Sequence, residues 1–308
     1  MTADQHESRH QNGHHHGHGH APSADFDWDA LAAHLEHEAD LRSDVVAEAA
    51  QWLTGLYGAG AWAGDGRGYS TVRRVLDVGS GPGVIAGLLA DAFPTAEVVA
   101  VDQSAALLER ARTRSNGRLG TQQADLPAEF DKLGEADLIW SGNAIHHLGD
   151  QQAALTSLAG LLRPGGLLAV AERGLPPRYL PRDFGLGRPG FQARLDAAHE
   201  DGFSTMRADL PGSVDEIEDW PAMLTRAGLV PSGTRTFLVD HPAPLDRPTR
   251  AYLHTQLSRL HDRLADVLTD EDRVTLEALL AEDAPTGILH RPDAFYLSAM
   301  TVHTARKP

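Results

Sequence analysis

The amino-acid sequence predicts an α/β fold with a doubly wound, mostly parallel sheet and additional helices. Three observations indicate this class. Short apolar runs alternate with helical patterns through the central part of the chain, as in parallel sheets with right-handed helical crossovers. The first of these runs ends in the glycine-rich turn VLDVGSGPG (75–83). Apolar residues at helical spacing recur on both sides of the alternating part, over 26–53 and 247–283.

The predicted elements follow in chain order. Apolar runs predict strands at 72–79, 96–102, 136–141, 167–172, 234–240 and 294–304. Between them, helical patterns predict helices at 84–92, 104–115 and 150–166. Ser213 is followed three residues later by Glu216, and this capping-box pattern predicts a helix over 213–228. Two further helices are expected within 247–283, before the last strand.

Changes in composition divide the chain into segments. Residues 1–24 are rich in His, Gly and Gln and nearly free of apolar residues, which predicts a disordered tail. Residues 25–70 are expected to form N-terminal helices and a glycine-rich connector. The α/β core is predicted over 71–240, a helical insertion over 241–293, and the final strand of the core over 294–308.

The composition also excludes several classes of protein. The 43 acidic and 27 basic residues give a net charge of -16, which disfavours a nucleic-acid partner because its phosphates require Lys and Arg. The absence of cysteine excludes disulfides, thiolate metal sites and a cysteine nucleophile. No apolar run reaches the roughly 18 residues of a membrane span, and the N-terminus lacks a signal-peptide core. A cytoplasmic protein with no membrane partner is therefore expected.

The glycine-rich turn is compatible with more than one nucleotide-like ligand. A Walker phosphate loop requires a lysine after its last glycine, and none is present near the turn. A dinucleotide fingerprint is matched by Gly81, Gly83 and Ala86, with Asp102 where a ribose-binding acid is expected. This short pattern is weakly specific, so an NAD-dependent oxidoreductase remains an alternative.

Five segments together resemble the motifs of class I S-adenosylmethionine-dependent methyltransferases. They lie in family order, at 75–83, 98–104, 123–127, 136–150 and 161–172. The resemblance implies a seven-stranded sheet with an antiparallel last strand, and a mainly helical cap made by the N-terminal helices and the 241–293 insertion. It also implies S-adenosylmethionine as the methyl donor and an enzyme acting on a small molecule. A protein that binds the donor without catalysis is a further alternative.

The resemblance implies a set of donor-binding residues at the ends of the predicted strands. Among them, Asp77 is placed near the donor's ammonium group, Asp102 at the two ribose hydroxyls and Asp125 at the adenine amino group. The complete set is Asp77, Gly79, Ser80, Gly81, Gly83, Asp102, Gln103, Ala124, Asp125, Leu126, Ser141, Gly142 and Asn143. The first two glycines would let the backbone approach the ligand, and Gly83 would allow the following helix to pack closely.

Candidate catalytic residues follow the fourth strand. Methyl transfer is an in-line displacement at an activated carbon, so alignment of the reactants is the main task of the protein. A general base is needed only when the acceptor must lose a proton. His146 and His147 are the candidates for this base, with a packing role as the alternative, and Glu172 is a weaker candidate. The first predicted helix also carries three residues that are candidates to approach the methyl group, Trp28, His34 and His37.

One basic stretch stands out in the acidic chain. Residues 173–194 carry five arginines against the single acid Asp183. Because arginine binds carboxylates and phosphates through two hydrogen bonds, Arg178 and Arg182 are predicted to hold an anionic acceptor. A solvated loop is an equally plausible interpretation of the same charges.

The remaining signals carry less weight. HESRH (6–10) matches a zinc-protease pattern, but that pattern functions only on a helix, and the tail is not expected to form one. The tail's imidazoles allow weak binding of divalent metals; no catalytic metal site is expected. The leucine stripes of the additional helices are typical of core packing or of a homodimer contact.

Overall fold

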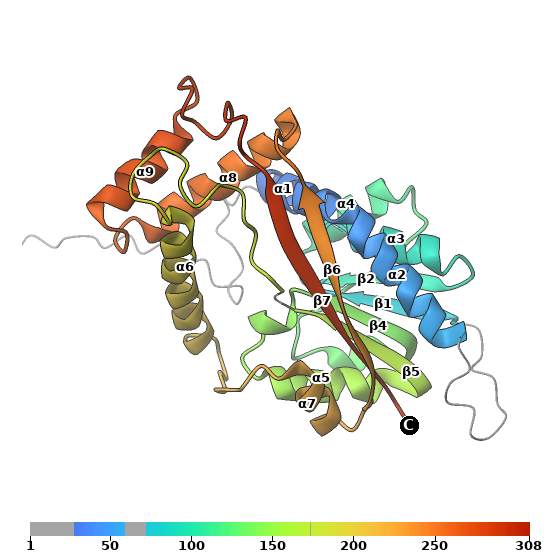
Figure 1. Cartoon of the computed structure of the whole chain (residues 1–308). Coiled ribbons are helices and arrows are strands. Elements are labelled where there is room, and N and C mark those ends of the chain that lie inside the picture. Colours follow the sequence, from blue (N-terminus) through green and yellow to red (C-terminus); the bar gives the residue numbers. More distant parts are fainter. Residues whose placement is uncertain (1–27, 59–71, 173) are drawn as a thin grey trace, which may run out of the picture.

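The computed structural model describes residues 28–58, 72–172 and 174–308 (Figure 1). These residues form a seven-stranded sheet with the order β3-β2-β1-β4-β5-β7-β6. The strands are β1 (Arg74–Val78), β2 (Glu97–Asp102), β3 (Gly120–Gln123), β4 (Ala136–Gly142), β5 (Leu162–Ala171), β6 (Val230–His241) and β7 (Tyr296–Arg306). β1 to β5 pair in parallel, and β7 is antiparallel to both of its neighbours. The predicted doubly wound sheet with an antiparallel last strand is confirmed.

Helices cover both faces of the sheet. They are α1 (Trp28–Leu41), α2 (Ser43–Gly58), α3 (Val84–Ala92), α4 (Ala105–Arg114), α5 (Gln151–Leu161), α6 (Phe191–Ala208), α7 (Trp220–Arg226), α8 (Arg247–Leu264) and α9 (Asp270–Leu280). Apolar residues of α2, α3 and α4 pack on one face, and those of α5 and α7 pack on the other. The central strands are buried on both sides for this reason, which explains their nearly continuous apolar sequences.

The pair β6–β7 extends beyond the rest of the sheet and carries the helical cap (Figure 1). β7 pairs with β5 only over four residues, Leu167–Val170, whereas β6 and β7 pair from Val230 and Arg306 to His241 and Tyr296. Around the far half of this pair, a separate apolar cluster joins α6, α8 and α9 to the segment that follows β5. The cap therefore has its own core, and its attachment to the sheet is an antiparallel ribbon.

Three local predictions differ from the structure. An 18-residue helix, α6, was not predicted. The helix expected at 213–228 is only α7, and its N-cap is Asp219, which accepts a hydrogen bond from the Ala222 amide. Ser213 does not cap a helix, because its hydroxyl donates to the Arg207 carbonyl at the end of α6. β3 was not recognised, since its sequence GTQQ lacks the apolar residues that identify a strand.

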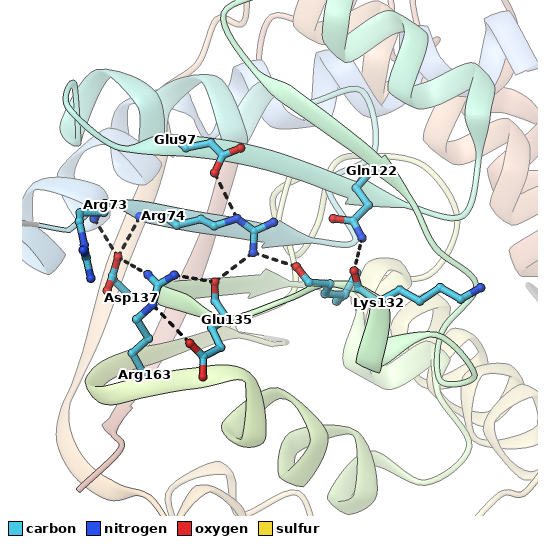
Figure 2. A network of polar contacts seen from close by, with 9 residues as sticks. Arg73, Arg74, Glu97, Gln122, Lys132, Glu135, Asp137 and Arg163 are labelled. Atoms are coloured by element: carbon cyan, nitrogen blue, oxygen red, sulfur yellow. Dashed lines mark hydrogen bonds and ion pairs between the residues drawn. The ribbon is translucent and has the colours of Figure 1, made fainter.

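The edge of the sheet where the parallel strands begin is held by a polar network (Figure 2). One oxygen of Asp137 accepts hydrogen bonds from the amides of Arg73 and Arg74 and from the Arg163 guanidinium, each at 2.9 Å. Arg74 also donates to the Glu135 carbonyl at 3.0 Å. Burial raises the pKa of Asp137, but these bonds outweigh it and lower the pKa. The network aligns the starts of β1, β4 and β5. The carboxyl ends of these strands, at the opposite edge, are available for a ligand-binding site.

None of the helices in the described part of the chain has the length and apolar content that a membrane crossing requires.

Two glycines around α3 provide a matched test of the packing. We expect Gly83→Ala to destabilise the fold by about 2 kcal/mol or more, because the φ of Gly83 is +75° and a Cβ there would lie 2.5 Å from the Ala111 Cβ. Gly87→Ala, inside the same helix, meets nothing within 4 Å and is expected to stabilise the fold by about 0.5–1 kcal/mol. Urea unfolding of both variants measures the difference, and equal effects would contradict the close contact of α3 with α4.

Candidate active site

The glycine-rich turn lies between β1 and α3, where the strand order of the sheet reverses. Ligands of open α/β sheets bind at such a point. Gly79, Gly81 and Gly83 all have positive φ angles, +77°, +53° and +75°, which glycine adopts without strain. A Cβ on Gly79 would lie 2.4 Å from the Ala144 Cβ, so this glycine permits contact with the loop after β4. Of the three glycines, Gly81 alone would make no close contact through a Cβ, since the nearest atom to that Cβ would be a methyl carbon of Leu35 at 3.9 Å.

Asp102, the last residue of β2, connects the glycine-rich turn to the turn that follows β2. Its two carboxylate oxygens accept hydrogen bonds from the amides of Gly81 and Ser104, each at 2.9 Å. The amides of Gly79 and Ser80 donate to the Val101 carbonyl at 2.9 and 3.0 Å. The Asp102 carboxylate is therefore fixed beside the turn and able to accept from a pair of hydroxyl groups.

Asp77 is a buried acid with one oxygen that has no hydrogen-bond partner among the described residues. The residue is only 1% exposed and lies in β1, two residues before Gly79. Burial first, and then the charge of Asp102, raise the pKa of Asp77 to about 7, although the Ala86 amide opposes this by donating to it. A buried carboxylate with a free oxygen is suited to a cationic ligand group. This geometry fits the ammonium group of S-adenosylmethionine.

The predicted adenine-side residues lie at the adjacent ends of β2 and β3. Gln103 and Asp125 are exposed, and the Gln123 side chain donates to the Gln103 carbonyl at 2.9 Å. The backbone amide of Asp125 donates a hydrogen bond to the Glu129 carboxylate at 2.9 Å. Ala124 is buried, while Leu126 is partly buried against the core. These residues follow Asp102 along the same edge, as the predicted donor site requires.

The predicted methionine-side residues lie at the end of β4, beside β1. The Ser141 side chain is fully buried and donates to the Val78 carbonyl at 3.3 Å, so its hydroxyl is engaged within the sheet. Gly142 has no room for a side chain, because a Cβ would lie 3.0 Å from the Trp140 indole nitrogen. Asn143 has a positive φ of 49°, and its amide donates to the Ala171 carbonyl. The chain thus turns sharply toward the two histidines.

Glu172, at the end of β5, has a larger part in the site than the sequence indicated. Its side chain is fully buried, and one oxygen accepts from the amides of Ala144 and Ile145 at 2.9 and 2.7 Å. The other oxygen lies 2.6 Å from Nδ1 of His146. Glu172 therefore fixes both the backbone of the short helix Ile145–His147 and the ring of His146.

Helix α6 supports the same turn from the other side. The Arg207 guanidinium donates to the carbonyls of His146 and Leu148 at 2.8 and 2.6 Å. The ring of Phe203 meets the His146 ring edge to face at 5.5 Å, and the His147 ring lies 4.1 Å from that of His146. His146 is buried and His147 is partly exposed. Sequence analysis missed this support because α6 itself was not predicted.

Two of the five arginines of the basic stretch are paired within the protein. The Arg178 guanidinium pairs with Asp196 of α6, and Arg194 pairs with Asp272 at 2.6 Å. Arg182 is exposed, and Arg173 lies outside the described residues. The ion pair of Arg178 competes with its predicted role in holding an acceptor. The assignment of Arg178 and Arg182 to the substrate stays a prediction.

Helix α1 lies beside the glycine-rich turn (75–83), which is called the donor turn below. It also contacts α3, α4 and α8. Leu35 faces Gly81, as given above, while the His34 ring stacks on Tyr252 of α8 at 5.1 Å. His37 also approaches Tyr252, at 5.8 Å. The side chain of Trp28 is not among those described. Helix α1 therefore lies between the core helices α3 and α4 and the cap helix α8.

The histidine-rich tail, and with it HESRH, lies outside the described residues. Within the described ranges, no group of three or more His, Asp or Glu side chains is arranged to hold a metal ion.

The fold and this site define a class I, S-adenosylmethionine-dependent methyltransferase domain. Comparison with known families agrees, because residues 75–166 match the methyltransferase domain family. That segment contains the glycine turn, Asp102 and the two histidines.

Individual proteins are similar to part of this chain. A trans-aconitate 2-methyltransferase of Methylobacterium radiotolerans is 43% identical over 98 residues, which is 32% of this chain and 37% of that protein. Another from Paracidovorax citrulli is 35% identical over 133 residues, 42% of this chain and 51% of that protein. The chain thus spans about half or less of the length of these relatives. A methyltransferase of Geobacter sulfurreducens solved with S-adenosylhomocysteine has a TM-score of 0.43, at 17% identity over 83% of this chain and 90% of that one.

Proposed function

We propose that this protein transfers a methyl group from S-adenosylmethionine to a small acceptor that carries carboxylates. The observation that carries the donor assignment is the arrangement of Asp77, Gly81 and Asp102 at the switch point of the sheet. The acceptor class is supported by the relatives named trans-aconitate methyltransferases, whose acceptor is a polycarboxylate by name.

In this proposal the donor supplies a methyl group already activated by its sulfonium centre. Asp77 binds the ammonium group, and the Asp102 carboxylate accepts hydrogen bonds from the ribose hydroxyls. The protein's residues then act by alignment, which brings the attacking oxygen, the methyl carbon and the sulfur into line. A carboxylate acceptor has no proton to lose, so no general base is required. Glu172 and His146 consequently serve to hold the 143–147 turn in place.

The alternative of a dinucleotide ligand is disfavoured by charge. A pyrophosphate group placed against the glycine turn would lie near the buried carboxylate of Asp77, two residues before Gly79. Repulsion between like charges at such a short distance is costly in a partly buried site. The oxidoreductase interpretation would therefore require Asp77 to stay protonated when the ligand binds.

The proposal is tested by thermal unfolding with S-adenosylmethionine, S-adenosylhomocysteine and NAD in parallel. A ligand present at 100 times its Kd stabilises the folded state by about 2.7 kcal/mol. We expect both adenosyl compounds to raise the Tm and NAD to have no effect. The response is expected to grow from pH 6 to pH 8, because the Asp77 pKa of about 7 must be passed before its carboxylate attracts the ammonium group.

Stabilisation by NAD alone would overturn the proposal. A protein that binds the donor without catalysis would give the same Tm shifts, so turnover is measured separately. Release of S-adenosylhomocysteine is followed with a panel of di- and tricarboxylates that includes trans-aconitate. Donor binding without turnover of any of these acids would leave the donor assignment intact and contradict the acceptor class.

A further inference from the structure

The facing surfaces of α1 and α8 carry several basic and aromatic side chains. On α8, Tyr252, Gln256, Arg259 and Arg263 recur at spacings of four, three and four, which places them along one side of the helix. The Tyr252 ring meets two imidazoles of α1, that of His34 at 5.1 Å and that of His37 at 5.8 Å. Gln256 donates to the Tyr252 hydroxyl at 2.9 Å and so fixes the ring.

The acid nearest to this surface is already neutralised. Glu38 of α1 pairs with Arg42 at 2.9 Å, and both side chains are about a quarter exposed. Arg259 is partly buried, and within the described part of the chain neither it nor Arg263 has a hydrogen-bond or ion-pair partner. Arg259 therefore lies partly buried at the packed helices, where Glu38 acts on it through space only, and Arg263 lies one turn further along α8 with an exposed side chain.

The electrostatic effects on these groups agree with this arrangement. Burial lowers the pKa of Arg259 and of Arg263. Burial also lowers the pKa of His34 to about 4, with further lowering by Arg259, His37 and Arg263 and opposition from Glu38. An uncompensated positive charge in a partly dry site is stabilised by an anion, since the ion pair is screened less there than in water.

The basic surface adjoins the donor site. His34 and Leu35 are consecutive residues of α1, and Leu35 lies against Gly81 of the donor turn. Since α1 is a single helix about 10–12 Å across with its side chains, a ligand held between α1 and α8 is within one helix width of the glycine turn.

We propose that Arg259, together with Arg263 and His34, binds a carboxylate of the methyl acceptor that is not methylated. This inference rests on the proposed function and deepens it, because it assigns acceptor recognition to the α1–α8 interface. Arginine suits the task since its planar guanidinium forms two parallel hydrogen bonds with a carboxylate. Recognition of the acceptor is thus separated from the basic stretch 173–194, where Arg178 is already paired with Asp196.

The test measures binding of tricarballylate, a saturated tricarboxylate, by calorimetry with the full chain saturated with S-adenosylhomocysteine. We expect Arg259→Ala to weaken binding of this probe at least about 10-fold, as for loss of a charged hydrogen bond worth 1.5–3 kcal/mol. Arg259→Lys is expected to recover part of the loss. Arg273→Ala is the matched control, because it removes the same charge from a surface ion pair of α9 and should leave probe binding unchanged.

The outcomes separate the two proposals. Unchanged probe affinity in Arg259→Ala overturns the inference, as does a loss confined to Arg178→Ala. So does wild-type protein that binds S-adenosylhomocysteine and not the probe, and that result leaves the donor assignment standing. Each variant is also titrated with S-adenosylhomocysteine alone, and unchanged affinity there shows that the variant is folded. Wild-type protein that fails to bind S-adenosylhomocysteine contradicts the proposed function itself.

Discussion

Replacement of Asp102 by alanine is expected to abolish donor binding, with a loss of at least about 100-fold in the affinity for S-adenosylhomocysteine. Two effects combine in this variant. The carboxylate proposed to accept from the ribose hydroxyls is removed, and hydrogen bonds to charged groups are worth about 1.5–3 kcal/mol each. The amides of Gly81 and Ser104 also lose the acceptor that holds the donor turn against the end of β2. Isothermal titration with S-adenosylhomocysteine measures the change.

Asp91→Ala is the control for this prediction. Asp91 lies in α3, the helix that follows the donor turn, and its 62% exposed side chain pairs with Arg118 at 2.7 Å. Exposed ion pairs contribute about 0–1 kcal/mol, so donor affinity should be unchanged in this variant. The fraction of binding-competent protein, read from the titration stoichiometry, separates weak binding from unfolding. Full affinity in Asp102→Ala would refute the assignment of this acid to the ribose.

The parts of the structure that the sequence predicted are those governed by local pattern. Buried strands such as β1 and β4 read as continuous apolar runs because both of their faces are covered. The roles of Asp77 and Asp102 were implied by the resemblance to methyltransferase motifs, in which acids lie at strand ends next to the glycine turn, and they stay predictions. For the strands the signal lies within a few residues, and burial on both faces of the sheet produces it.

The parts that the sequence did not predict depend on contacts between distant residues. Glu172 reaches the 143–147 turn across 25 or more positions of the chain, and no spacing rule connects them. Helix α6 has a weak apolar side, with Phe191 and Leu195 buried but Gly202 in its interior, so its periodicity was overlooked. With α6 missing, neither Asp196 as the partner of Arg178 nor Arg207 as the support of the histidines could be foreseen.

The contacts of Glu172, Asp196 and Arg207 were not predicted for one physical reason, and they alter which side chains are available in the site. The cap packs on the core through side chains from α1, α6 and α8, whose relative positions are set by tertiary contacts. Charges that look available in the sequence, such as Arg178, are neutralised across this interface. Others, such as Arg259, look like ordinary surface charges of an amphipathic helix and are partly enclosed. A count of charges along the chain therefore does not show which arginines are already paired within the protein.

Replacement of Glu172 by alanine is expected to destabilise the fold by about 3 kcal/mol or more. The substitution leaves the amides of Ala144 and Ile145 and the Nδ1 atom of His146 without their acceptor in a buried setting. Each buried polar group that loses its partner costs about 1–3 kcal/mol. Urea unfolding measures the effect. Glu48→Ala is the control, since Glu48 is 55% exposed in a surface pair with Arg235 and its loss should cost less than about 1 kcal/mol.

The conservative variant Glu172→Gln separates a positioning role from general-base catalysis. Its amide oxygen can still accept from Ala144 and Ile145, while its nitrogen faces His146 and forces the ring to accept at Nδ1. For a carboxylate acceptor the kcat should then change by less than about 10-fold, with the larger effect on donor affinity, because the turn shifts and no proton must be removed. Loss of a general base would instead lower kcat by roughly 10²–10⁴-fold and alter its pH profile. A fall of that size in both Glu172→Gln and His146→Ala would show that the acceptor carries a proton, and would exclude a carboxylate oxygen as the atom that receives the methyl group.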